Sequence, residues 1–248
     1  LAEAWQQFQG GQLPAAEQGA RALVADRADD ADALHLLALV SHRQGRSSEA
    51  LALFQAAAAA RPGDGEIRNN QGCMLMELGR PAEAAEALGQ AIRLKPTDVM
   101  AMRNLASVQR ALGRFADAAL SLQQALELKP DFADAHAALA QVLVDLGRPG
   151  EALSHAQRAA QIQPQLISAQ ATLGIVLHEL GRPAESVQAL KRALAIDPGH
   201  AEARSNLRIV YASMVPAWHF TMLNDEVRND AYDRAIRAAV MPRDHVLE

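Results

Sequence analysis

The stretch LGRPAEAAEALGQAIRLKP, residues 78–96, contains the two signals from which the fold follows. Its Gly-Arg pair begins at Gly79 and is typical of a helix end, because glycine adopts the left-handed conformation there without steric cost. Its last residue, Pro96, ends the next helix, because proline removes a hydrogen bond that the helix needs. Between these stops the apolar residues keep a helical spacing, so the stretch predicts a turn followed by a helix.

Both signals recur every 34 residues along the chain. Two interlocked series at one period indicate a repeat protein. We use "register" for a position within this 34-residue unit. The prolines are Pro62, Pro96, Pro130, Pro164 and Pro198, and the glycines are Gly45, Gly79, Gly113, Gly147 and Gly181, with Gly11 extending the series backwards. A single helix pair cannot bury its apolar face alone, so the units are expected to stack into a solenoid.

Small residues fill three registers in every unit, which permits neighbouring helices to cross closely at the same points. The three sets are Ala38, Gly72, Ala106, Ala140 and Gly174; Ala50, Ala84, Ala118, Ala152 and Ser186; and Ala57, Ala91, Ala125, Ala159 and Ala193. After His200 the pattern begins again and then fails, because Arg208 occupies the register that holds Ala or Gly in every earlier unit. We expect residues 201–216 to form a capping helix.

This pattern resembles the tetratricopeptide repeat (TPR) family over residues 1 to about 214. The resemblance implies an all-α, right-handed α-solenoid of helix–turn–helix units. We divide the chain into a partial unit at 1–30, five full units at 31–200 and the cap at 201–216.

The resemblance also implies a concave groove, lined by the first helix of each unit, that binds a protein or peptide. An asparagine amide can both donate to and accept from a peptide backbone. Two arginines seven residues apart on one helix share a face and could meet an acidic segment. The predicted groove residues are His35, Asn69, Asn70, Arg103, Asn104, Arg110 and His178. The alternative for each of them is a solvated polar residue on a helix surface.

Composition argues against several other partners. The formal net charge is −5, which disfavours nucleic acid. No run of about 18 apolar residues occurs, so we expect no membrane span. The single Cys73 fits a reducing compartment, and no secretory signal opens the sequence, so we expect a cytoplasmic protein. The eight histidines are scattered without metal-ligand spacing, so we expect no metal, and the repeats carry no catalytic motif.

The segment MLNDEVRNDAY, residues 222–232, departs from the repeat. Its Met-Leu-x-Asp-x-x-Arg-x-x-x-Tyr pattern resembles the segment before the cofactor-binding strand of protein arginine methyltransferases, in particular members that carry TPR units. For the parent protein the resemblance implies S-adenosylmethionine, with Arg228 pairing with its carboxylate. It places Met222 and His219 beside the same cofactor and substrate pocket. Residues 217–248 would then be a linker and a helix that precedes the catalytic domain.

The resemblance also implies parts that do not occur before Glu248, namely a Gly-rich cofactor turn and paired glutamates. We therefore expect no catalytic residue and no bound cofactor in residues 1–248 alone. The sequence is interpreted as the substrate-recruiting N-terminal part of an S-adenosylmethionine-dependent protein arginine methyltransferase. The alternative is a stand-alone TPR adaptor without enzymatic activity, and a more distant one is the repeat domain of a glycosyltransferase.

Overall fold

The computed structural model describes residues 1–214, together with residues 230 and 234. Residues 1–214 form thirteen α-helices and no strand, which confirms the predicted all-α solenoid. The helices are α1 (Ala2–Gln9), α2 (Leu13–Asp26), α3 (Ala31–Arg43), α4 (Ser47–Ala60), α5 (Gly65–Glu77), α6 (Pro81–Leu94), α7 (Val99–Ala111), α8 (Phe115–Leu128), α9 (Ala133–Asp145), α10 (Pro149–Ile162), α11 (Ile167–Glu179), α12 (Pro183–Ile196) and α13 (Ala201–Met214).

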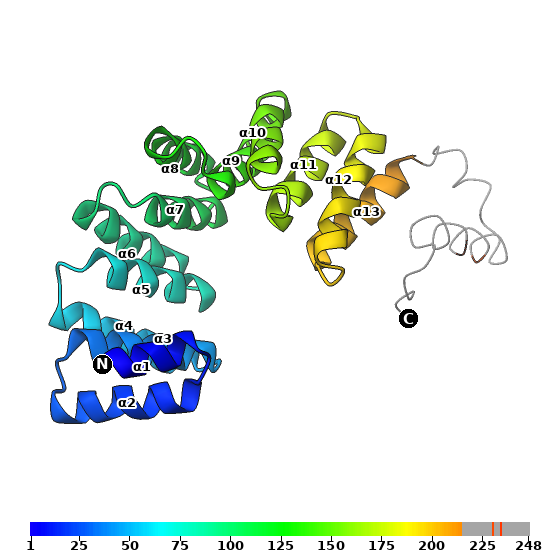
Figure 1. Cartoon of the computed structure of the whole chain (residues 1–248). Coiled ribbons are helices and arrows are strands. Elements are labelled where there is room, and N and C mark those ends of the chain that lie inside the picture. Colours follow the sequence, from blue (N-terminus) through cyan, green and yellow to red (C-terminus); the bar gives the residue numbers. More distant parts are fainter. Residues whose placement is uncertain (215–229, 231–233, 235–248) are drawn as a thin grey trace.

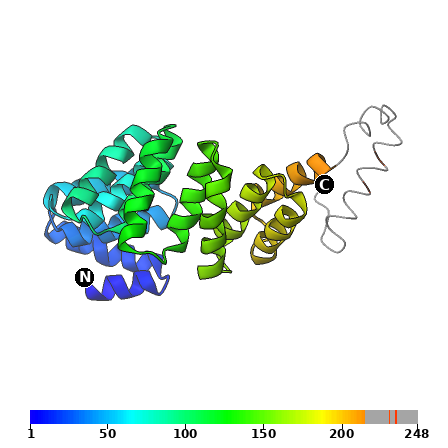
Figure 2. The same cartoon turned by 90° about the horizontal axis from the view of Figure 1, so that it is seen from above.

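The helices pair in chain order and stack into an arch (Figure 1). Helices α5, α7 and α9 lie on the inner side of this arch, and α6, α8 and α10 lie on its outer side. Seen from above, the units follow one another along an elongated body, with α1 and α13 at opposite ends (Figure 2). No helix within residues 1–214 is both long and apolar enough to cross a membrane.

The Gly-Arg pairs end the odd-numbered helices as predicted. Gly79 has a φ of +71°, and its N–H donates to the carbonyl of Met76 at 3.1 Å. The next N–H, of Arg80, donates to the carbonyl of Leu75 at 2.8 Å, which completes a Schellman turn. All six glycines of this series have φ between +68° and +77°. The Arg80 side chain then donates to Glu83 in the first turn of the next helix, at 2.7 and 2.6 Å.

The prolines end the even-numbered helices, also as predicted. Helix α6 ends at Leu94, Lys95 caps it, and Pro96 follows. The next helix starts at a capping side chain, because Asp98 accepts hydrogen bonds from the N–H groups of Met100 and Ala101. The same aspartate cap starts α3 and α5, at Asp30 and Asp64, whereas α9 and α11 start at Phe132 and Leu166 without a side-chain cap.

The small registers allow the close crossings that the sequence predicts. A Cβ atom added to Gly72 would lie 2.5 Å from Cγ of Leu88, and one added to Gly174 would lie 2.5 Å from Cγ of Leu190. The all-alanine register is buried in all five units, at Ala57, Ala91, Ala125, Ala159 and Ala193. These contacts fix how the two helices of a unit cross.

Helix α13 covers one side of α12. Its residues Ala203, Leu207 and Val210 are buried against that helix, whereas Arg208 is exposed. The expected division of the chain at residues 30, 200 and 216 stays a prediction, and residues 217–248 lie outside the described part except for residues 230 and 234.

Candidate binding groove

A chain of hydrogen-bonded side chains crosses the odd-numbered helices from α7 through α5 to α3. Arg103 Nη1 donates to Asn104 Oδ1 at 2.9 Å, and Asn104 Nδ2 donates to Asn69 Oδ1 at 2.9 Å. Asn69 Nδ2 donates to Asn70 Oδ1 at 3.5 Å. The Asn70 amide nitrogen lies 2.8 Å from His35 Nε2. We call these five residues the polar ladder.

The direction of the polar ladder follows from its arginine end. A guanidinium group can only donate, so Asn104 must turn its carbonyl oxygen towards Arg103 and its amide nitrogen towards Asn69. The same order passes along the amides until Asn70 donates to His35. The His35 Nε2 must therefore accept, which requires a neutral ring with its proton on Nδ1.

His35 lies behind the surface of the groove. Its side chain is 7% exposed and meets the Trp5 and Phe54 rings, with centroids 5.9 and 5.8 Å away. Burial lowers the pKa of His35, because the charged imidazole loses hydration there. Of the predicted groove residues, His35 thus supports Asn70 from within, and a ligand in the groove would meet Asn70 first.

Charged side chains also join neighbouring odd-numbered helices, nearer their C-terminal ends. Arg110 on α7 donates to Asp145 on α9 through Nε and Nη2, at 2.5 and 3.4 Å. His42 Nε2 lies 2.8 Å from Glu77 Oε2, and the hydrogen bonds from Ser47 and His42 lower the pKa of Glu77. In both pairs the partners are 35 residues apart. The same separation joins His35 to Asn70 and Asn69 to Asn104 in the polar ladder.

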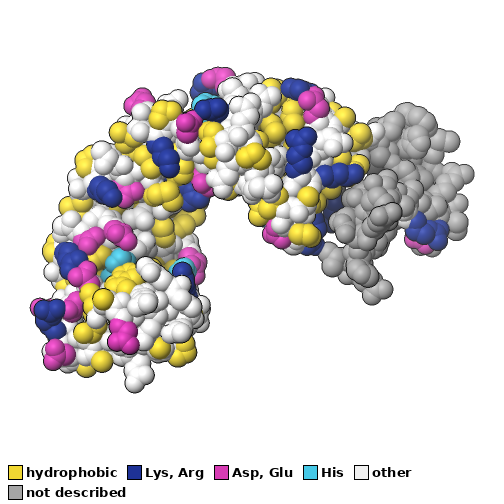
Figure 3. Space-filling model, viewed as in Figure 1, with side chains coloured by type: hydrophobic (Ala, Val, Ile, Leu, Met, Phe, Trp, Pro, Cys, Tyr) yellow, Lys and Arg dark blue, Asp and Glu magenta, His cyan; other side chains and the backbone are white. Residues whose placement is uncertain are grey.

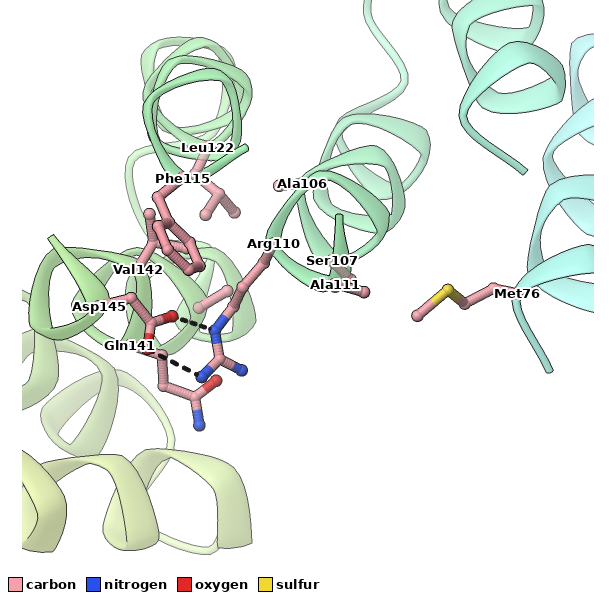
Figure 4. Close-up of a pocket in the computed structure, with 11 residues that line it drawn as sticks. Met76, Ala106, Ser107, Arg110, Ala111, Phe115, Leu122, Gln141, Val142 and Asp145 are labelled. Atoms are coloured by element: carbon pink, nitrogen blue, oxygen red, sulfur yellow. Dashed lines mark hydrogen bonds and ion pairs between the residues drawn. The ribbon is translucent and has the colours of Figure 1, made fainter. Parts of the chain in front are cut away.

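A pocket with a volume of about 420 Å³ opens between α7 and α9, with α8 behind it (Figure 4). Its lining residues are Met76, Ala106, Ser107, Arg110, Ala111, Phe115, Leu122, Ala138, Gln141, Val142 and Asp145. Ala138 stands in the register where α5 and α7 carry Asn70 and Asn104. At this register α9 therefore offers the polar ladder no amide, and the space that such a side chain would fill stays open.

The remaining predicted residues lie apart from the polar ladder. His178 is half-buried in the last turn of α11, where its carbonyl accepts the N–H of Gly181. The predicted cofactor-binding residues His219, Met222 and Arg228 lie outside the described residues. Within the described part of the chain, no three side chains suited to a metal ion gather in one place.

Two residues of the site were missed at the sequence level, namely Asp145 and Phe115. Asp145 is 35 residues from Arg110, which is one repeat plus one residue, so a search for complementary side chains at that separation would have found it. Phe115 follows a Gly-Arg pair where other units have Pro or Ser, and that substitution was a visible signal.

Models of the family described as "tetratricopeptide repeat" match residues 1–65, 69–131 and 131–199. The chain belongs to the tetratricopeptide repeat family. The matched residues include those of the polar ladder and of the pocket, so both lie within the TPR units. No curated protein sequence matches this TPR chain significantly.

Solved structures with this fold include PilW, a widely conserved type IV pilus biogenesis factor, with a TM-score of 0.73, 21% identity, and 83% of this chain and 96% of that chain covered. YrrB, described as a TPR protein with an unusual peptide-binding site, has a TM-score of 0.58, 20% identity, and 77% and 98% covered. A chain of the APC/C hetero-tetramer Cut9-Hcn1 has a TM-score of 0.73 and 18% identity. That match covers 84% of this TPR chain but only 41% of the other chain. At these identities the likeness shows the fold alone.

Proposed function

We propose that the inner side of the arch binds an extended segment of a partner protein. The observation that carries this proposal is the row of amide groups in the polar ladder. A carboxamide can take part in four hydrogen bonds, and Asn69 uses two of them within the ladder. Its free donor and acceptor capacity matches the one N–H and one C=O that a peptide group presents.

The shape and the charge of the molecule support a protein ligand. Solenoids present extended concave surfaces of the kind used for recognition, and YrrB offers a precedent for peptide binding on this fold. On the face shown in Figure 3, basic and acidic side chains are interspersed rather than gathered into a basic stripe. A phosphate backbone would favour such a stripe, so we propose a protein and not a nucleic acid as partner. As part of this proposal we place the protein in the cytoplasm.

Selection of a random peptide library against the full chain tests this proposal. We expect enriched peptides to bind the unchanged protein and to bind Asn69→Ala about 5-fold to 20-fold more weakly, because a peptide hydrogen bond is lost. Gln123→Ala removes an exposed amide from the outer helix α8 and is the matched control, with unchanged affinity expected. Equal affinity of all three proteins for the peptides would show that the polar ladder is not part of the binding site.

We further propose that the parent protein is an S-adenosylmethionine-dependent protein arginine methyltransferase whose TPR units recruit the substrate. The Met222 to Tyr232 pattern alone supports this, since the family-model matches end at residue 199. Recruitment by a fused module raises the effective substrate concentration at a catalytic site. Arg228 would pair with the cofactor carboxylate, with Met222 and His219 near it.

The gene sequence beyond the codon for Glu248 tests this second proposal. Continuation into a Gly-rich turn with paired glutamates is expected, and the longer protein should then bind S-adenosylmethionine in calorimetry and lose that binding on Arg228→Ala. A reading frame that stops at Glu248 would instead favour the stand-alone TPR adaptor.

A further inference from the structure

We infer that the pocket between α7 and α9 receives one large apolar side chain of the segment bound in the groove. This inference rests on the proposed groove function and names the ligand chemistry that the groove selects. The pocket volume of about 420 Å³ lies within the range of sites that bury a ligand group.

The deep side of the pocket is hydrocarbon. Leu122 and Val142 are buried core residues, with exposed fractions of 0% and 1%. The Phe115 ring is half-buried and lies between Val142 and Arg110 (Figure 4). An aromatic ring at the base of a pocket adds contact area and a defined shape for an apolar or aromatic ligand group.

The rim of the pocket carries no unpaired charge. The only charged residues among its lining are Arg110 and Asp145, and they neutralise one another through two hydrogen bonds (Figure 4). A charged ligand side chain would lose its hydration on entry without gaining an opposite partner, which is unfavourable. An apolar side chain loses no such hydration, so the charge distribution favours it.

The polar ladder and the pocket are continuous along α7. Arg103, Ser107 and Arg110 are spaced four and three residues apart and therefore share one helix face. Gln141 faces the same opening from α9 and is half-buried, with an amide that can bond a peptide group. A segment whose backbone is held by the polar ladder would thus place its next side chain at the pocket.

The register of Ala138 supplies a way to close the pocket without designing a new core. The same register holds Leu36 in the first full unit, where leucine is buried with 0% exposed. Ala138→Leu therefore introduces a side chain that the scaffold already accommodates at this register. Ala59→Leu adds the same atoms at an exposed position of α4 and is the matched control.

The test selects a phage-displayed random peptide library on the full chain, then measures synthetic copies of the enriched peptides by calorimetry. We expect the enriched peptides to share one large apolar residue, whose replacement by alanine weakens binding about 10-fold to 100-fold. Ala138→Leu should weaken binding of the enriched peptide by a similar factor and leave the affinity for its alanine-substituted version unchanged. Ala59→Leu should change neither affinity.

Different outcomes separate this inference from the groove proposal. Failure to enrich any peptide would contradict both the proposed peptide binding in the groove and this inference. Enriched peptides without a shared apolar residue, or with equal affinity for Ala138→Leu and the unchanged protein, would overturn the pocket inference alone. Circular dichroism verifies that Ala138→Leu is folded, and Ser107→Trp, at the exposed mouth of the pocket, gives a second block should it unfold.

Discussion

The inner side of the arch is built differently before and after the pocket. From α3 to α7, the polar ladder joins neighbouring odd-numbered helices through hydrogen bonds. At the same two registers, α9 and α11 carry Ala137, Ala138, Ala171 and Thr172. Ala137 and Thr172 are 2% and 0% exposed, and α9 and α11 lie closer together than α5 and α7 do.

This difference shows how one scaffold supports two kinds of surface. The registers that fix the crossing within each unit hold small residues throughout, so the helix pairs are alike. The two registers between units vary in size and polarity, and they decide whether neighbouring units meet through amides or through direct packing. The pocket lies where one arrangement gives way to the other.

The largest effect is expected from moving an amide into the closely packed half. Ala137→Asn would bury a polar side chain between α9 and α11 and should lower the free energy of unfolding by about 2–4 kcal/mol. Urea denaturation followed by circular dichroism measures it, with Ala59→Asn on the exposed face of α4 as control. A loss below about 0.5 kcal/mol would mean that the two halves tolerate the same side chains and that the comparison is mistaken.

A smaller effect, equal in both halves, is expected within the units. In Gly72→Ala and Gly174→Ala, the new Cβ would lie 2.5 Å from a leucine Cγ. Each should destabilise by about 1–2 kcal/mol, because the overlap outweighs a gain in helix propensity of about 1 kcal/mol. Gly89→Ala, on α6, meets only an arginine side-chain end at 3.7 Å and should stabilise the protein instead. Markedly unequal values for Gly72 and Gly174 would contradict a common scaffold.

Removing a ladder amide should have a still smaller and local effect. Asn104→Ala removes the hydrogen bonds to Asn69 and from Arg103, and should lower the free energy of unfolding by about 1 kcal/mol. Hydrogen exchange read by mass spectrometry should show faster exchange in α5 and α7 and no change in α9 and α11. Faster exchange spread evenly over both halves would show that the polar ladder is not a separate unit.

The weakest expected effect is the pH dependence of stability that His35 of the polar ladder contributes. Burial lowers the pKa of His35 below its ordinary 6.5, so the folded protein binds this proton less readily than the unfolded chain. The contribution of neutral His35 to the free energy of unfolding is therefore complete above pH 6.5. It is lost as the pH falls through the pKa that His35 has in the folded protein. The charged groups that act on His35 are Glu66, Asp64 and Asp32, which raise its pKa, and Arg61, which lowers it.

NMR titration of His35 measures this pKa directly. The difference in the free energy of unfolding between the unchanged protein and His35→Gln, followed against pH, isolates the contribution of His35 to the pH dependence. That comparison is needed because burial also lowers the pKa of His155, whose Nδ1 lies 2.9 Å from Nδ1 of His136. A His35 that titrates at or above pH 6.5 would contradict both its burial and its role as the acceptor of the polar ladder.

The sequence carried the fold almost completely because each unit encodes its own ends. Gly79 and Pro96 stop helices through backbone chemistry that needs no distant partner, and the structure places the ends where they predict. For the site, Asn69, Asn70 and Asn104 were predicted as groove residues, the last two from a shared register, and the structure joins all three in the polar ladder. The roles proposed for His219, Met222 and Arg228 stay predictions.

By itself, then, the sequence determined the period, the helix ends and the small registers, all of which depend on local backbone preference or on the size of a side chain. Only the tertiary structure decided which side chains meet between units. Stacking shifts neighbouring odd-numbered helices so that contacts fall one residue beyond the 34-residue period, which pairs Arg110 with Asp145 and Asn69 with Asn104. That shift results from how the helices pack, and it buried His35 and opened the pocket beside Ala138.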